Sequence, residues 1–158
     1  MSEKGRCPLA CYARGRAARC SYAFSDRIDS ILTINALNMA VQRQKPKPGL
    51  IFHSDRGVQY ASAAYRQVLA SHGLCQSMSR KGDPYDNAVA ENFFSCLKCE
   101  CVYLQYFATR NQAKTAVFRY IEAFYNPIRP HSGIGWLAPN VFESWLPSAD
   151  FALPRNSA

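Results

Sequence analysis

The chain has 158 residues, of which 48% are hydrophobic, so it can bury a core, and disorder throughout is excluded. Its formal net charge of +8 and its pI near 9.3 favour a polyanionic partner, because Lys and Arg side chains that neutralise phosphates release counterions. The sequence shows no signal-peptide core and no membrane-length apolar run. It contains seven cysteines, an odd number. It therefore predicts a cytoplasmic protein with reduced thiols and no membrane partner.

The first 20 residues are rich in Arg, Cys, Ala and Gly and show neither strand alternation nor a helical apolar stripe. We expect no folding element there and predict that residues 1–20 are disordered. From residue 21 the pattern changes, so one domain is predicted over residues 21–146, followed by a frayed tail over 147–158.

A strand over 21–24 and a helix over 30–43 open this domain, and Asp26 or Asp29 can provide the N-cap of the helix. The helix carries one apolar face, which is made of Ile31, Ile34, Leu37 and Val41. The proline-rich run at 45–49 ends the helix, because proline lacks an amide donor and disfavours the helical conformation in the residue before it.

The rest of the domain alternates strands with helices and then becomes helical. The predicted elements are strands over 50–53 and 74–78, helices over 61–71, 88–100 and 111–125, and a short helix over 139–145. A basic loop over 79–85 precedes the helix at 88–100. The helix at 111–125 carries a wide apolar stripe that we interpret as core packing, made of Ala113, Ala116, Val117, Tyr120, Ile121, Phe124 and Tyr125. This order of elements predicts an α/β architecture with a partly parallel sheet.

Two carboxylates stand at positions that suit a divalent metal ion. Asp55 follows the apolar strand over 50–53, and Glu91 lies on the first turns of the helix over 88–100. Mg²⁺ and Mn²⁺ prefer carboxylate oxygens, and such ions assist phosphoryl transfer. The pattern by itself leaves two other interpretations open, in which Asp55 caps a turn and Glu91 is a solvated helix residue.

Three stretches of the sequence together resemble the integrase core of bacterial insertion-sequence transposases. They are His53 to Tyr60 (HSDRGVQY), Asp83 to Phe94 (DPYDNAVAENFF), and Leu97-Lys98 with Glu100. The resemblance is to the insertion sequence three group, whose members are relatives of retroviral integrases. The 35 residues between Asp55 and Glu91 equal that group's spacing between its second acid and its glutamate. The group's C-terminal pattern is matched by Tyr125-Asn126, Arg129 to Ser132 (RPHS), Pro139 and Phe142-Glu143.

The resemblance implies a ribonuclease H-like fold whose site of three acids binds two Mg²⁺ or Mn²⁺ ions and cuts and joins DNA strands. Under it, Asp55 is the second acid, Glu91 is the third, and Lys98 contacts DNA near the site. The basic side chains expected at DNA are Lys98, Arg56, Arg80, Lys81, Arg129 and His131. The implied partners are transposon ends and target DNA at the nucleoid, together with a second copy of the chain or a full-length transposase.

The sequence departs from the group at the first acid, which the resemblance places on a strand before residue 21. Residues 1–20 contain no Asp, and Asp26 and Asp29 fall where the group begins its first helix. We therefore expect an incomplete core whose opening strands are missing or were replaced by a frameshift or late start. Because the three acids act together, loss of one of them should reduce catalytic activity by about two or more powers of ten.

Three functions remain open on the sequence. The first is a transposase integrase core for DNA transposition, impaired by the missing acid. The second is a non-catalytic DNA-binding or interaction fragment, and the third is a pseudogene product without function. Salt-sensitive DNA binding without cleavage distinguishes the second from the first.

Overall fold

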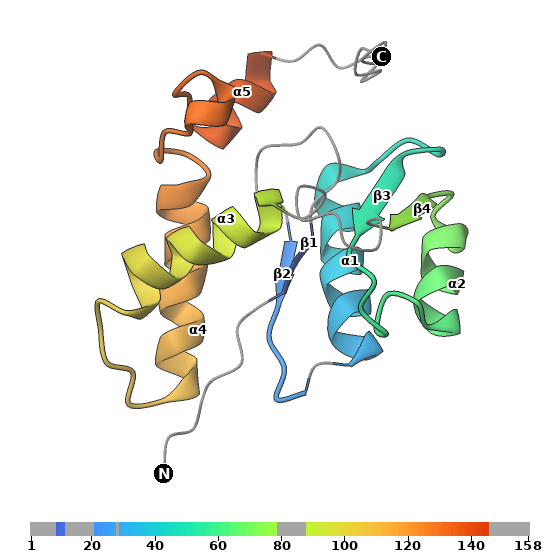
Figure 1. Ribbon diagram of the computed structural model, residues 1–158, viewed down its shortest axis with the longest axis horizontal. Helices are drawn as coiled ribbons and strands as arrows, with labels where there is room; N and C mark the ends of the chain where they lie inside the picture. Colours follow the sequence, from blue (N-terminus) through green and yellow to red (C-terminus); the bar gives the residue numbers. More distant parts are fainter. Residues whose placement is uncertain (1–8, 12–20, 28, 79–87, 146–158) are drawn as a thin grey trace.

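The computed structural model describes residues 9–11, 21–27, 29–78 and 88–145. Strands and helices alternate in the first part, and helices alone make up the second (Figure 1). The elements are β1 (Leu9–Cys11), β2 (Ser21–Ala23), α1 (Ser30–Gln44), β3 (Ile51–Ser54), α2 (Ala63–Ser71), β4 (Cys75–Met78), α3 (Ala88–Leu97), the π-helix η2 (Lys98–Val102), α4 (Arg110–Arg119), the π-helix η3 (Tyr120–Tyr125), the 3₁₀-helix η4 (Ser132–Ile134) and α5 (Pro139–Trp145).

The four strands pair in two separate sheets. β1 runs antiparallel to β2, with Ala10 opposite Tyr22, and β3 runs parallel to β4, with His53 opposite Ser77. The parallel pair is connected through α2, which is the usual crossover for parallel strands. The expectation that residues 1–20 contain no folding element is wrong for Leu9–Cys11, because pairing with a partner strand can stabilise three residues that lack a period of their own.

The start and end of α1 follow from its caps. The Leu32 amide donates to Asp29 Oδ1 at 2.9 Å, so Asp29 is the N-cap, as one of the two predicted alternatives had it. The helix ends at Lys45, which is left-handed with φ 43° and donates its amide to the Val41 carbonyl. Pro46 explains this end, because it disfavours the helical conformation in the residue before it.

The buried face of α1 keeps most of the predicted apolar face: Leu37 is buried, and Ile34 and Val41 pack against the cluster that contains it. Leu32, Ala36 and Leu37 are buried, whereas Ile31 is 65% exposed, so the prediction that Ile31 faces the core is wrong. Periodicity defines a stripe about 100° wide but does not fix which edge of that stripe meets the neighbouring elements. Here the strands and α2 cover the side of Leu32 and Ala36, and Ile31 is left in solvent.

A close backbone approach orders the segment between α2 and β4. Ser62 caps α2 by accepting the Tyr65 amide, and the helix stops before Gly73, whose φ is +66°. The Gly73 carbonyl accepts the Gly49 amide at 2.7 Å. A Cβ at Gly73 would lie 3.2 Å from the Pro48 Cβ, so both the positive φ and this approach favour glycine.

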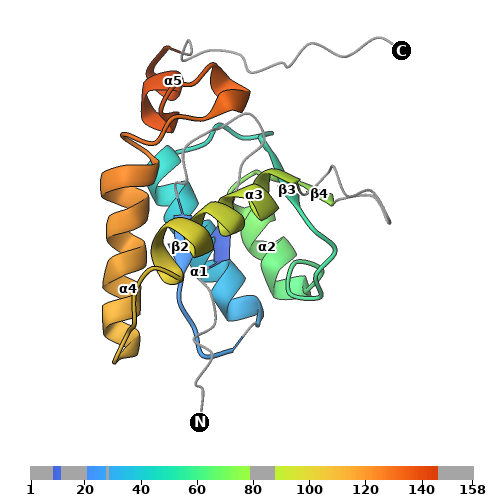
Figure 2. The same cartoon turned by 60° about the vertical axis from the view of Figure 1, so that its left-hand side comes forward.

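Two hydrophobic cores lie on either side of α1. The first core is formed by Ala36, Leu37, Phe52, Tyr60, Tyr65, Leu69 and Leu74. The second core is formed by Tyr22, Phe93, Leu97, Cys101, Val117, Tyr120, Ile121 and Tyr125. Figures 1 and 2 show α2 with β3 and β4 on one side of α1 and the helices α3 and α4 on the other. Met39 of α1 packs against the second core, so this helix is shared by both.

The predicted helices over 88–100 and 111–125 both exist, but each widens into a π-helix before its end. α3 becomes η2 at Lys98, and α4 becomes η3 at Tyr120. Within η3 the buried residues are Tyr120, Ile121 and Tyr125, whereas Phe124 is 40% exposed, which contradicts its predicted place in the core. A wider turn changes the angle per residue, so the 3.6-residue period no longer assigns faces there.

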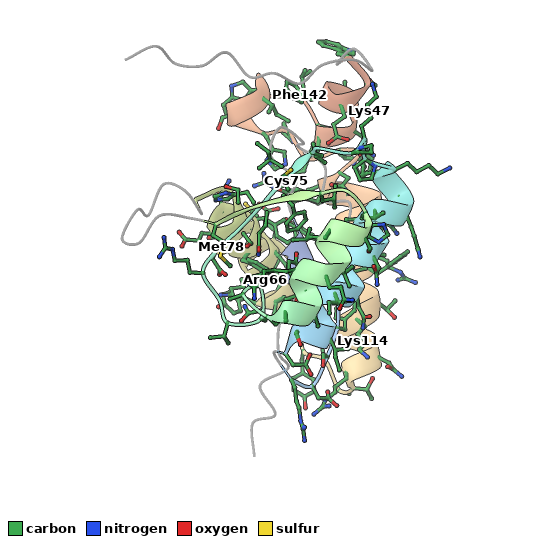
Figure 3. All side chains as sticks on the ribbon, turned by 90° about the vertical axis from the view of Figure 1, so that its right-hand side faces the viewer. Lys47, Arg66, Cys75, Met78, Lys114 and Phe142 are labelled. Atoms are coloured by element: carbon green, nitrogen blue, oxygen red, sulfur yellow. The ribbon has the colours of Figure 1, made fainter. Side chains whose placement is uncertain are left out.

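Basic side chains are spread over the surface. Lys47, Arg66 and Lys114 come from a loop, α2 and α4, and all three are exposed (Figure 3). In the part of the chain that the structure describes, no helix has the length and apolar character needed to cross a bilayer.

The second core supplies a matched test of burial. Leu97 is fully buried and Leu104, on the exposed turn after η2, is 74% exposed. We expect Leu97→Ala to lower the free energy of unfolding by about 2–5 kcal/mol, because it leaves a cavity, and Leu104→Ala to change it by less than about 0.5 kcal/mol. Urea unfolding followed by circular dichroism measures both. Equal losses in the two variants would contradict the assignment of Leu97 to the core.

Candidate functional site

Asp55 lies immediately after β3, where the parallel strand ends. Its side chain is half-buried, and its Oδ1 accepts the Gly57 amide at 2.8 Å, which folds the chain into a turn. Ser54 donates its hydroxyl to the Asp55 carbonyl at 3.1 Å. The backbone on both sides of Asp55 is thereby fixed, so the carboxylate stands on an ordered strand end.

Glu91 and Lys98 lie on the continuous helix formed by α3 and η2. Both side chains are exposed, while Phe93 and Leu97 of the same helix are buried in the second core. Lys98 is the first residue of the π-helix, and its carbonyl accepts the Tyr103 amide at 2.8 Å. The buried residues fix the helix, and Glu91 and Lys98 project from it into solvent.

The two acids stand on elements of different cores. β3 and the first core carry Asp55, and α3 and the second core carry Glu91. In Figure 2 the amino-terminal end of α3 overlaps β3 in the view, but in Figure 1 the two lie apart, so the views do not place the two acids side by side. Within the described ranges, no three His, Cys, Asp or Glu side chains gather into a group that could hold a metal ion. A metal held by Asp55 and Glu91 stays a prediction.

The two other aspartates that the structure describes are engaged elsewhere. Asp29 caps α1 through the Leu32 amide, and Asp26 forms an ion pair with Arg110 at the start of α4. Both therefore have structural roles at the positions where the family resemblance places the first helix rather than an acid of the site.

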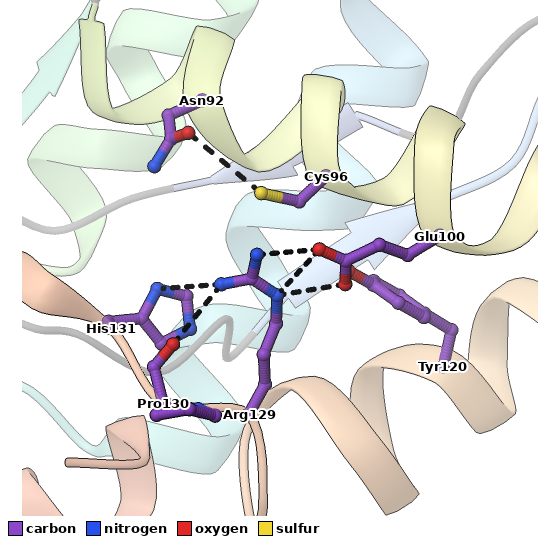
Figure 4. A network of polar contacts seen from close by, with 7 residues as sticks. All are labelled: Asn92, Cys96, Glu100, Tyr120, Arg129, Pro130 and His131. Atoms are coloured by element: carbon purple, nitrogen blue, oxygen red, sulfur yellow. Dashed lines mark hydrogen bonds and ion pairs between the residues drawn. The ribbon is translucent and has the colours of Figure 1, made fainter. Parts of the chain in front are cut away.

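A polar network joins η2 to the segment after η3 (Figure 4). Arg129 Nε donates to Glu100 Oε1 and Oε2 at 3.0 and 2.8 Å, and Arg129 Nη2 donates to Glu100 Oε1 at 2.6 Å. The Tyr120 hydroxyl donates to Glu100 Oε2 at 2.8 Å. The Glu100 carboxylate thus accepts four charge-assisted or neutral hydrogen bonds, and it ties together three segments of the second half.

Aromatic rings pack around this network. The Arg129 guanidinium carbon lies 5.8 Å from the centroid of the Tyr125 ring, and the His131 ring meets the same Tyr125 ring edge to face at 4.7 Å. Arg129 Nη1 lies 3.4 Å from His131 Nδ1 and 3.3 Å from the Pro130 carbonyl. The Tyr125 ring therefore lies against one face of the guanidinium, and Nη1 faces Pro130 and His131.

The network shifts the protonation of its members. The hydrogen bonds from Arg129 lower the pKa of Glu100 below its usual value of 4.5, and the same bonds raise the pKa of Arg129. Burial, followed by the hydrogen bond to Glu100, raises the pKa of Tyr120. At neutral pH the pair is ionised and the Tyr120 hydroxyl keeps its proton.

The predicted DNA-binding residues fall into three groups. Lys98 and Arg56 are exposed, and Arg80 and Lys81 lie outside the described residues. Arg129 and His131 belong to the network of Glu100. The structure thus adds two residues to the site region. Glu100 belonged to the sequence motif without a role, and Tyr120 was expected only as core packing.

The comparisons with known proteins identify the family. Two family models, both described as integrase core domain, match residues 18–84 and 72–139. Together they extend over more than half of the chain and include both Asp55 and Glu91. The chain belongs to the integrase core domain family, as its motifs predicted.

Particular relatives are bacterial transposases. The chain is 41% identical over 124 residues to the transposase for insertion sequence element IS904 of Lactococcus lactis subsp. lactis (strain IL1403). The matched region covers 78% of this chain and 49% of that protein. It is 45% identical over 123 residues to transposase InsF for insertion sequence IS3A of Escherichia coli (strain K12), covering 78% of this chain and 43% of that protein. The chain spans about half the length of the curated relatives it matches.

A solved structure confirms the predicted fold class. A chain of the cryo-EM structure of the simian T-cell lymphotropic virus intasome in complex with PP2A regulatory subunit B56 gamma matches with a TM-score of 0.65 at 16% identity. The match covers 87% of this chain and 49% of that chain. The fold is α/β and ribonuclease H-like.

The protonation of Glu100 predicts a pH dependence of stability. Because folding lowers the pKa of Glu100, its pair with Arg129 stabilises the fold above pH 4.5 and loses that contribution as pH falls through the lowered pKa. We expect Glu100→Gln to be less stable than the unsubstituted chain at pH 7. The difference in their free energies of unfolding should become smaller below pH 4.5. Urea midpoints across this pH range measure it.

Asp26→Asn is the control, because it removes a carboxylate from the exposed pair with Arg110. An exposed pair contributes about 0–1 kcal/mol, so this variant should stay close to the unsubstituted chain at every pH. If the stability difference between Glu100→Gln and the unsubstituted chain stays constant down to about pH 3, the role of the Glu100 charge is contradicted.

Proposed function

We propose that residues 21–146 act on DNA as an integrase core of the transposase kind, at the nucleoid in the bacterial cytoplasm. One observation carries the proposal: the integrase core match runs without a break through Asp55, at the end of β3, and Glu91, on the first turn of α3. The identity of 41–45% to insertion sequence transposases supports transposon ends and target DNA as the substrates.

In this proposal Asp55 and Glu91 hold Mg²⁺ or Mn²⁺. The donor set fits such ions, because both groups are carboxylates and hard cations prefer oxygen. Asp55 Oδ1 accepts the Gly57 amide, and this bond orients the carboxylate at the strand end. When bound, a divalent ion supplies electrostatic stabilisation of the attacking and leaving oxygens in phosphoryl transfer. The chain's own residues orient the carboxylates and bind the DNA backbone.

Basic residues on this side of the chain would bind phosphate. Lys98 follows Glu91 by two helical turns, and its exposed ammonium can reach DNA that lies over the site. Arg56 follows Asp55 directly and is exposed as well. We assign Arg80, Lys81 and His131 to the same DNA surface on the basis of the sequence motif. A second copy or a full-length transposase is a further proposed partner.

A second candidate function is DNA binding without strand transfer. Residues 1–20 contain no Asp, and Asp26 and Asp29 are held by Arg110 and by the first turn of α1. We propose on this basis that the described residues supply two acids to the site, and for a site with those two alone we expect strand transfer reduced by about two or more powers of ten while phosphate contacts remain.

Binding of Mn²⁺ tests the two acids. We expect Asp55→Asn and Glu91→Gln each to weaken Mn²⁺ binding about tenfold or more, because each removes a charged oxygen ligand. Electron paramagnetic resonance of free Mn²⁺ during a titration measures the affinity. Glu143→Gln, a carboxylate on α5, is the control and should bind as the unsubstituted chain does. Unchanged affinity in Glu91→Gln would remove Glu91 from the site.

Binding and nicking of DNA distinguish the two candidate functions. Fluorescence anisotropy with a labelled duplex should show an affinity that falls steeply with salt, and Lys98→Ala should reduce the slope of log K against log salt by about 0.9. With Mn²⁺ and supercoiled DNA, nicking that Glu91→Gln abolishes supports the strand-transfer core. Binding without nicking supports the second candidate, and no binding at low salt contradicts both.

A further inference from the structure

The Arg129 guanidinium has protein partners at all three of its nitrogens. Nε and Nη2 donate to the Glu100 carboxylate at 2.6–3.0 Å, and Nη1 lies 3.3 Å from the Pro130 carbonyl and 3.4 Å from His131 Nδ1. The Arg129 side chain is only 21% exposed. A DNA phosphate could pair with the edge formed by Nε and Nη2 only after the Glu100 carboxylate had been displaced.

Displacement of Glu100 from Arg129 is unfavourable. The carboxylate of Glu100 is half-buried and would lose three charge-assisted hydrogen bonds, which are about twice as strong as neutral ones. A phosphate would then have to approach beside the abandoned carboxylate, and the two negative charges would repel each other. The contacts therefore argue against a direct role of Arg129 at DNA.

The same contacts fix the position of Lys98. Glu100 lies two residues after Lys98 in η2, and it is held by Arg129 on one side and by the Tyr120 hydroxyl on the other. Leu97 and Cys101, on either side of Lys98 and Glu100, are buried. The backbone of Lys98 is thus fixed between buried anchors, while its side chain remains exposed.

The contact forms where both helices are π-helical. π-Helices account for well under 1% of residues, and they occur often at functional sites. Here η2 and η3 each contribute a partner to one hydrogen bond, Glu100 from η2 and Tyr120 from η3. The wider turn directs the Glu100 carboxylate toward Tyr120 and Arg129, and Lys98 occupies the first position of that turn.

We propose that Arg129 is a positioning residue that holds Lys98 at the DNA surface through Glu100, and is not itself a phosphate contact. This role rests on the proposed DNA-binding function. Removal of either Arg129 or Glu100 then has the same consequence, because both release η2 and leave Lys98 poorly placed.

Substitution of Glu100 separates the two roles by the sign of its effect. If Arg129 positions Lys98, Glu100→Gln weakens binding to a labelled duplex relative to Asp26→Asn, a control that removes the same charge from an exposed ion pair. If Arg129 binds phosphate directly, Glu100→Gln releases the guanidinium and strengthens binding relative to that control. The second result would overturn the proposal.

A double-mutant cycle with Lys98→Ala measures the coupling between Arg129 and Lys98 in DNA affinity. A purely structural role of Arg129 would produce no such coupling. One phosphate contact is worth about eightfold in affinity at 0.1 M salt and about 0.9 in the salt slope. We expect Arg129→Met to add little to Lys98→Ala, so that the double variant loses about 0.9 in slope. A loss of about 1.8, with additive effects on affinity, overturns the proposal.

Two further variants control for charge and folding. Arg110→Met removes an arginine from an exposed ion pair and should leave the contribution of Lys98 unchanged. Arg129→Lys keeps the charge but cannot make the bidentate contact, so it should weaken binding in the same direction as Arg129→Met. Full affinity in Arg129→Lys, equal to that of the unsubstituted chain, counts against the positioning role.

Amide hydrogen exchange distinguishes failure of this proposal from failure of the proposed function. If the unsubstituted chain binds no DNA, the proposed function fails. The contact itself is then judged by residues 98–102, whose amides should exchange several-fold faster in Arg129→Met than in Arg110→Met. Equal exchange in these two variants overturns the role of Arg129 in holding η2.

Discussion

The ion pair between Glu100 and Arg129 is the contact on which the second half of the chain depends. It joins residues 29 positions apart and connects the end of the α3 helix with the segment that follows η3. A half-buried ion pair contributes stability only when its geometry and additional hydrogen bonds offset the desolvation of both charges. Tyr120 supplies a further donor to the carboxylate, and Tyr125 lies under the guanidinium. Removal of one partner would leave the other charged and poorly solvated.

A second acid ties α1, the helix shared by both cores, to the second core. The Glu122 carboxylate accepts the Tyr22 hydroxyl at 3.0 Å and forms an ion pair with Arg43 of α1. Burial raises the pKa of Tyr22, so its hydroxyl remains protonated and continues to donate to Glu122 at neutral pH. The contact links β2 and α1 to η3, which belongs to the second core. Because Asp55 stands on the side of the first core and Glu91 on the second, their mutual position depends on this junction.

Local sequence signals located most elements of the fold. The caps and prolines placed the ends of α1 within about a residue, and α5 occupies its predicted range. The errors occur where contacts from elsewhere in the chain decide the outcome. Periodicity placed Ile31 in the core, but the neighbouring elements cover Leu32 instead. No pattern indicated β1, because a three-residue strand is stabilised by its partner β2 and not by its own period.

By itself, the sequence determined the family and the order of the elements and singled out Asp55, Glu91 and Lys98 as candidates, since these depend on motifs and on residues close together in the chain. Only the tertiary structure decided which groups Arg129 contacts. Its basic side chain in a motif indicated a DNA contact, whereas its partners Glu100 and Tyr120 come from two other helical segments. It also decided that both helices become π-helical where that contact forms. A charge has no partner in a linear sequence, and the partner it acquires on folding determines whether it remains available to a ligand.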